Sequence, residues 1–159
     1  MLSVENVYKY FDGREVLHDI NCSFEQGKTN LIIGQSGSGK TVLMKCLIGL
    51  YEVDKGKIFY DNRDFYALTK QERKNIRREM GVLFQGGALF DSMTVKENVV
   101  FPMIMLSDMT DAEKNDRVDF CLERVNLKDT HQLYPSQLSG GMRKRVAIAR
   151  SIALNPKYL

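Results

Sequence analysis

Apolar and polar residues alternate with a period of two along much of the first third of the chain. Residues 2–11 (LSVENVYKYF) and 15–25 (EVLHDINCSFE) follow this pattern, and a turn at Asp12-Gly13-Arg14 separates them. Alternation of this kind predicts two strands. Residues 29–33 (TNLII) form a continuous apolar run that predicts a buried strand, and residues 56–61 (GKIFYD) predict a further strand.

Helical signals dominate the rest of the chain. Three threonines each precede a glutamate by three residues, which is the capping-box pattern of a helix start. We expect helices that start near Lys40, Thr69, Thr94, Thr110 and Gly140, with Pro156 ending the last one. Residues 81–84 (GVLF) predict one more short buried strand.

Composition is that of an ordinary globular protein. The chain has 159 residues, 43% of them hydrophobic and 27% charged, and a net charge of only +3. This charge gives no strong attraction to nucleic acid, so no nucleic-acid partner is expected. No apolar window approaches the roughly 18 residues of a membrane span, and the N-terminus lacks an export pattern. Cys22, Cys46 and Cys121 show no paired spacing, which predicts reduced thiols and a cytoplasmic location.

The stretch GQSGSGKT lies between the apolar run and the first expected helix, and it matches the phosphate-loop pattern. Its glycines permit backbone angles that let amide groups surround a phosphate, and the helix dipole adds positive potential at the same point. Lys40 supplies a charge for the β- and γ-phosphates, and Thr41 supplies a hydroxyl for Mg²⁺. The candidate ATP-binding residues are Gly34, Gln35, Ser36, Gly37, Ser38, Gly39, Lys40 and Thr41.

The phosphate loop does not select a base, but aromatic residues near the N-terminus could do so. Tyr8, Tyr10 and Phe11 precede a turn, where one ring could stack on adenine. Ordinary packing within a strand is the alternative for each ring.

A second anion-binding pattern occurs at LSGGM, where Ser139, Gly140 and Gly141 open the last helix. A hydroxyl, two unobstructed amides and a helix dipole meet there. A simple helix cap is the alternative interpretation.

Together these motifs resemble the nucleotide-binding domain of ABC ATPases over essentially the whole chain. The resemblance rests on GQSGSGKT, on Gln85 in GVLFQGGALF, and on LSGGM followed by RKRVAIARSIALNPK. It implies an α/β fold: a P-loop core with an N-terminal antiparallel β subdomain and an inserted helical subdomain. Residues 1–85 and 138–159 would belong to the ATP-binding core, and residues 86–137 to the helical subdomain.

The resemblance also implies roles for single residues. Lys40 and Gln85 would act in catalysis, and Thr41 and Gln85 would contact Mg²⁺. Phe11 would stack on adenine, with Tyr10 as the alternative. Two copies would pair head to tail as a homodimer, so that Ser139, Gly140 and Gly141 of one copy face the ATP on the other.

Such a protein would drive an integral membrane permease and would lie at the inner face of the cell membrane. The segment LFQGGALFDSMTVKENV and the methionine of LSGGM resemble the ATPase subunits of Mla/Mce-type lipid transporters, which suggests a phospholipid cargo. Phe101, Met103, Ile104 and Met105 form an apolar cluster that either docks the permease or belongs to the helix core.

The family's Asp-Glu pair lies on a strand that would follow NPK, and this sequence ends about two residues into that strand. We therefore expect that the 159-residue chain does not hydrolyse ATP alone, whereas the intact protein does. Two other functions stay open: a short ATP-binding regulator without hydrolysis, and a soluble ABC ATPase that is not a transporter.

Overall fold

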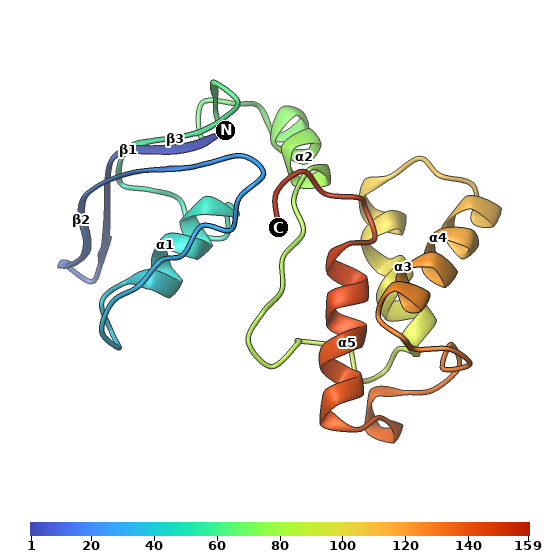
Figure 1. Ribbon diagram of the computed structural model, residues 1–159. Coiled ribbons are helices and arrows are strands. Elements are labelled where there is room, and N and C mark those ends of the chain that lie inside the picture. Colours follow the sequence, from blue (N-terminus) through green and yellow to red (C-terminus); the bar gives the residue numbers. More distant parts are fainter. The chain divides into compact units, whose positions relative to one another are not determined.

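The computed structural model describes all 159 residues, which form two compact units, Met1–Arg73 and Lys74–Leu159 (Figure 1). The boundary falls inside helix α2 (Lys70–Arg78). No helix in the chain combines the length and the apolar character that a membrane crossing requires. The functional division expected from the family resemblance groups the residues differently and stays a prediction.

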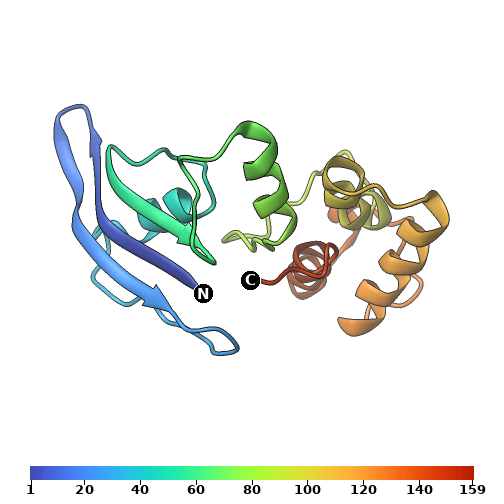
Figure 2. The same cartoon turned by 90° about the horizontal axis from the view of Figure 1, so that it is seen from above.

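An antiparallel sheet of four strands forms the frame of the first unit (Figure 2). Its strands lie in the order β2-β1-β3-β4. They comprise β1 (Leu2–Phe11), β2 (Arg14–Phe24), β3 (Lys55–Tyr60) and β4 (Arg63–Asp64). The alternating pattern therefore predicted the first two strands and the turn between them correctly.

Helix α1 (Lys40–Leu47) packs with this sheet through a shared apolar core. The buried side chains of the unit include Val4, Val7, Leu17, Leu43, Cys46, Leu47, Ile58, Tyr60 and Phe65. Two tyrosine hydroxyls hold the C-terminal end of α1. Tyr60 donates to the carbonyl of Leu47 at 2.7 Å, and the hydroxyl of Tyr66 lies 2.6 Å from the carbonyl of Cys46. These bonds satisfy carbonyls that the helix itself leaves unpaired.

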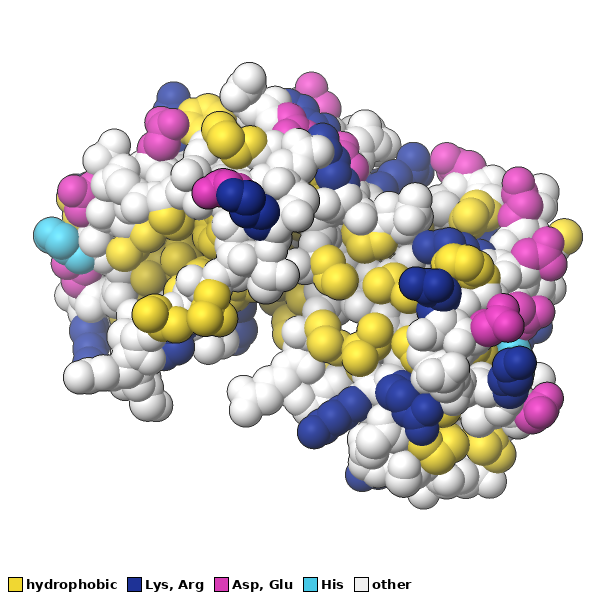
Figure 3. All heavy atoms as spheres, viewed as in Figure 1, with side chains coloured by type: hydrophobic (Ala, Val, Ile, Leu, Met, Phe, Trp, Pro, Cys, Tyr) yellow, Lys and Arg dark blue, Asp and Glu magenta, His cyan; other side chains and the backbone are white.

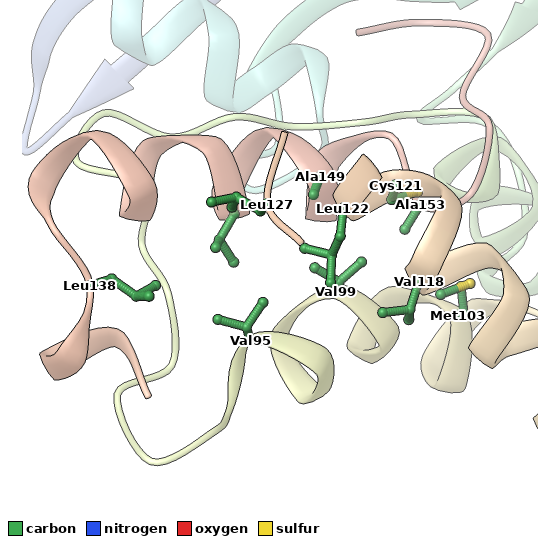
Figure 4. Packing of buried hydrophobic residues seen from close by; sticks show 11 residues of the cluster. Val95, Val99, Met103, Val118, Cys121, Leu122, Leu127, Leu138, Ala149 and Ala153 are labelled. Carbon is green, nitrogen blue, oxygen red and sulfur yellow. The ribbon is translucent and has the colours of Figure 1, made fainter. Parts of the chain in front are cut away.

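Three α-helices and one short 3₁₀ turn form the second unit together with the C-terminal part of α2. They are α3 (Val95–Leu106), α4 (Asp111–Arg124), η1 (Pro135–Gln137) and α5 (Gly140–Ser151). Apolar side chains of α3, α4 and α5 point toward one another in a single core (Figure 4). Fully buried members of this core include Val99, Val118 and Ala149. The helical periodicity of the sequence thus matches one packed interior.

Two arginines join α4 and α5, because each lies near the middle of its own helix and bonds to carbonyls at the C-terminal end of the other. Arg117 of α4 donates to the carbonyls of Ile152 and Ala153, both at 2.8 Å. Arg145 of α5 donates in turn to the carbonyl of Asn126 at 2.9 Å. Each helix therefore supplies the cation that neutralises the negative end of the other.

The predicted capping boxes form at the starts of α3 and α4. The hydroxyls of Thr94 and Thr110 accept from the backbone amides of Glu97 and Glu113, and each glutamate carboxylate accepts from the amide of its threonine. A reciprocal bond of the same kind joins Thr69 and Glu72 before α2.

Two predicted strands are wrong. Residues 29–33 have no strand structure, and the side chains of Leu31 and Ile33 are 81% and 80% exposed. Residues 81–84 also lack a strand, although Met80 just before them forms an isolated parallel bridge with Tyr158. The reason is that a parallel strand needs a neighbour to complete its hydrogen bonds, and apart from this one bridge the chain provides none. Hydrophobic side chains accordingly reach the surface in both units (Figure 3).

Candidate functional site

The phosphate loop joins residues 29–33 to helix α1 in the first unit. Gly37 and Gly39 have φ angles of 81° and 89°, in the left-handed region that side chains rarely adopt. A Cβ atom on Gly39 would lie 2.9 Å from the carbonyl oxygen of Val16 and 2.9 Å from the side chain of Leu17. Strand β2 therefore supports the loop from behind, and only glycine fits at the helix start.

Lys40 folds back across the loop that precedes it. Its Nζ donates to the carbonyls of Gly34 at 2.8 Å and Gln35 at 2.7 Å. The amide of Ser38 closes a turn on the carbonyl of Gln35 at 3.2 Å. The loop is consequently a closed ring of backbone with an ammonium group across it. Ser36 and Thr41 are exposed, so their hydroxyls are accessible.

The first turn of α1 keeps its amides available. Gly39 is the N-cap residue, and no side chain caps this helix start. The first turn also contains no acidic residue. The positive end of the helix dipole is therefore not neutralised, which suits an anionic ligand such as the phosphates of ATP.

Of the three candidate aromatic residues, Phe11 is the most exposed. It is 37% exposed at the end of β1, and its ring meets that of Tyr51 edge to face, with 5.2 Å between centroids. Tyr10 instead bonds to Glu15, which raises the pKa of the Tyr10 hydroxyl. Tyr8 contacts the ring of His18. This arrangement favours Phe11 over Tyr10 as the stacking ring.

Gln85 lies in the second unit at the exposed tip of a turn. The amide of Gly87 donates to the carbonyl of Phe84 at 2.9 Å, which places Gln85 and Gly86 at the centre of the turn. Gly86 has a φ of 81°, as this turn geometry requires. The side chain of Gln85 is free to reach a ligand.

The LSGGM segment forms the start of α5 in the same unit. The hydroxyl of Ser139 accepts from the amide of Met142 at 3.2 Å, so Ser139 acts as a helix cap. Gly140 and Gly141 are exposed, and a Cβ atom on Gly140 would meet nothing within 4 Å. Cap and anion site are therefore compatible here, because the amides on the open side remain accessible.

The candidate residues fall into two groups. Phe11 and the phosphate loop belong to Met1–Arg73, whereas Gln85 and Ser139–Gly141 belong to Lys74–Leu159. In the apolar cluster of α3, Met103 is fully buried and is a core residue, while Ile104 and Met105 are 58% and 55% exposed. These two remain available for a partner.

Sequence reasoning missed three residues that support these groups. Tyr51 contacts Phe11, Arg150 bonds to the turn that contains Gln85, and the buried Asn98 bonds to the segment that follows this turn. Asn98 had a detectable signal, because it is a polar residue within an apolar helical segment. Tyr51 and Arg150 had none, because their partners are distant in the sequence.

Known proteins resemble this chain in sequence and in fold. Residues 17–159 match the family model described as ABC transporter. The chain is 37% identical over 159 residues to the methionine import ATP-binding protein MetN of Clostridioides difficile (strain 630), and 41% identical over 163 residues to MetN 1 of Rhodococcus jostii (strain RHA1). These matches cover 100% of this chain but 49% and 48% of the relatives, so the chain spans about half of their length.

Among solved structures, the chain matches a dimeric post-hydrolysis state of the ATP-binding cassette MJ0796 bound to ADP and Pi. The TM-score is 0.86 and the identity 34%, and the match covers 98% of this chain and 71% of that chain. The match confirms the expected α/β fold of the ABC ATPase type. The chain belongs to the ABC transporter family, as part of its ATP-binding domain.

Proposed function

We propose that this chain binds Mg²⁺ and ATP as part of the ATPase subunit of an ABC transporter. The observation that carries the proposal is the phosphate loop itself: a backbone ring held by Lys40 in front of an uncapped helix start. The glycine angles and the accessible hydroxyl of Thr41 fit a nucleotide phosphate with its Mg²⁺.

In this function the residues have distinct tasks. The ammonium group of Lys40 turns from the loop carbonyls to the β- and γ-phosphates, and the loop amides neutralise negative charge on them. The resemblance gives Thr41 and Gln85 as the residues that would each contact Mg²⁺, and Gln85 would also contact the attacking water. The ring of Phe11 stacks on the adenine. When bound, Mg²⁺ would neutralise negative charge on the phosphates.

The assembly follows from the same family membership. Two copies pair head to tail, so that Ser139, Gly140 and Gly141 of one copy bind the γ-phosphate on the other. The pair works with a membrane permease and is peripheral to the inner face of the membrane. Support comes from the name of the MetN relatives, which are import proteins, and from the matched cassette, which is a dimer.

The transported substrate is the least supported part of the proposal. Residues 83–99 suggested a phospholipid. The relatives instead include methionine importers and a probable ribonucleotide transport protein of Mycobacterium leprae, so their names give no support to a lipid. The import of a small molecule such as methionine is therefore the second candidate.

Isothermal calorimetry with Mg²⁺ and ATP tests the binding function. Lys40→Ala removes the charge at the phosphates, and a charge-assisted hydrogen bond contributes about 1.5–3 kcal/mol. Because 1.4 kcal/mol is tenfold in affinity, we expect a loss of at least about tenfold. Lys28→Ala is the matched control, since Lys28 is exposed in the same unit and pairs only with Glu25.

Equal affinities of the two variants would refute the assignment of the phosphate loop. Phosphate release measured on the same samples checks the expectation that the 159-residue chain does not hydrolyse ATP alone. Co-purification with a membrane protein distinguishes the transporter from a soluble ABC ATPase or a regulator.

A further inference from the structure

The turn that contains Gln85 is bonded to helix α5 by one side chain. The guanidinium group of Arg150, near the end of α5, donates through Nη2 to the carbonyl of Gly87 at 2.6 Å and through Nη1 to the carbonyl of Ala88 at 2.9 Å. These carbonyls lie two and three residues after Gln85. The planar fork of arginine suits this contact, because two parallel donors fix orientation as well as distance.

The turn that contains Gln85 also packs directly against α5. A Cβ atom on Gly87 would lie 3.2 Å from the Cβ atom of Ala147 of α5, and Gly87 has a φ of 83°. The backbone of the turn therefore lies close to α5, and a side chain at position 87 would press on Ala147. The guanidinium of Arg150 also lies 5.7 Å from the ring centroid of Phe90, three residues beyond Gly87.

Helix α3 holds the residues that follow this turn, from Phe90 to Met93. Asn98 of α3 is fully buried, and its side chain accepts from the amide of Phe90 at 2.9 Å. Its Nδ2 group lies 3.1 Å from the carbonyl of Phe90 and 3.1 Å from that of Met93. Asn98 thus holds the far end of the segment, and Arg150 is the polar anchor of the end that contains Gln85.

Partial burial of Arg150 disfavours its charged form, and its hydrogen bonds must offset this loss of hydration. Burial lowers the pKa of its guanidinium, and both of its hydrogen bonds go to carbonyl oxygens. Removal of the cation would leave those two carbonyls without this donor. The arginine therefore stabilises one position of the turn.

We propose that Arg150 is a positioning residue, which fixes the turn containing Gln85 to the helix that begins at Ser139–Gly141 so that the two move as one body. The consequence for nucleotide binding rests on the proposed function, because Gln85 and Ser139 are assigned to ATP there. The positioning itself is a property of the chain without nucleotide.

Amide hydrogen exchange of the nucleotide-free chain, read by mass spectrometry, tests this proposal. Arg150→Met removes both donors, and we expect the amide of Gly87, which bonds to the carbonyl of Phe84, to exchange at least about tenfold faster in a peptide that spans residues 84–90, while α3 and α4 keep their rates. Arg150→Lys keeps one charged donor and should restore part of the protection. Arg145→Met is the matched control, because it removes two similar carbonyl bonds of the same helix, to Val125 and Asn126.

The proposal is overturned if residues 84–90 exchange at the wild-type rate in Arg150→Met. It is also overturned if Arg145→Met exposes these residues to the same extent, since the effect would then be general destabilisation. If Arg150→Met does not fold, Arg150→Lys decides: unchanged exchange of residues 84–90 refutes the proposal, and selective acceleration supports it. None of these outcomes depends on ATP, so a failure here is separate from a failure of Lys40→Ala.

Discussion

Replacement of Gly39 by alanine tests how the phosphate loop is held. Two effects act at this position. The φ of 89° lies in the left-handed region, and the new Cβ atom would lie 2.9 Å from the carbonyl oxygen of Val16. The nearby methyl group of Leu17 can rotate away, but the carbonyl belongs to strand β2 and cannot move without disturbing the sheet.

Gly37 separates these two effects. Its φ of 81° is similar, but a Cβ atom there would meet nothing within 4 Å. We expect Gly37→Ala to cost about 1–2 kcal/mol, the price of a left-handed residue alone. Gly39→Ala adds overpacking of about 1–3 kcal/mol, so its total is about 2–5 kcal/mol.

The measurement is the opening free energy of α1, from amide exchange of residues 40–47 in both variants. Gly39→Ala should reduce protection of α1 more than Gly37→Ala and should weaken ATP binding in calorimetry. Equal costs for the two variants would refute the reasoning, because they would show that β2 does not support the loop.

Three further predictions concern other parts of the chain. The amide and hydroxyl of Thr94 lower the pKa of Glu97. The ionised carboxylate should therefore stabilise the fold at neutral pH, and this stabilisation should be lost as the pH falls below about 4.3. Glu97→Gln should flatten that part of the curve of unfolding free energy against pH. Leu31 is 81% exposed, and burying it between two copies of the chain can contribute about 1.5–3 kcal/mol to association. Sedimentation velocity should therefore show self-association that Leu31→Ser reduces. A strictly monomeric wild type would contradict this prediction. Phe11→Ala should weaken ATP binding more than Tyr10→Ala does, and the reverse order in calorimetry would reassign the stacking ring.

Local signals in the sequence predicted the elements that depend on nearby residues. Thr94 and Glu97 are only three residues apart, so their capping box could be inferred without tertiary contacts. The glycines at positions 37 and 39 likewise have the left-handed angles that a phosphate loop needs. These features form wherever the local chain folds.

The failures have a common physical cause. An apolar run such as residues 29–33 becomes a buried strand only if neighbours complete its hydrogen bonds, and sequence periodicity does not contain that condition. Arg150 could not be assigned from the sequence, since the two carbonyls that it binds are 62 and 63 residues away. Tyr66 likewise reaches back over 20 residues to Cys46.

The tyrosine hydroxyls at the end of α1 have a consequence for biosynthesis. A helix of eight residues is too short to be stable alone, so α1 depends on its tertiary contacts. Tyr66 follows Cys46 by 20 residues, and ribosomes add about 5–20 residues per second. Cys46 is therefore synthesised roughly 1–4 s before Tyr66, the anchor of this helix end. During synthesis, helix α1 can complete its tertiary contacts only after the chain as far as Tyr66 has been made.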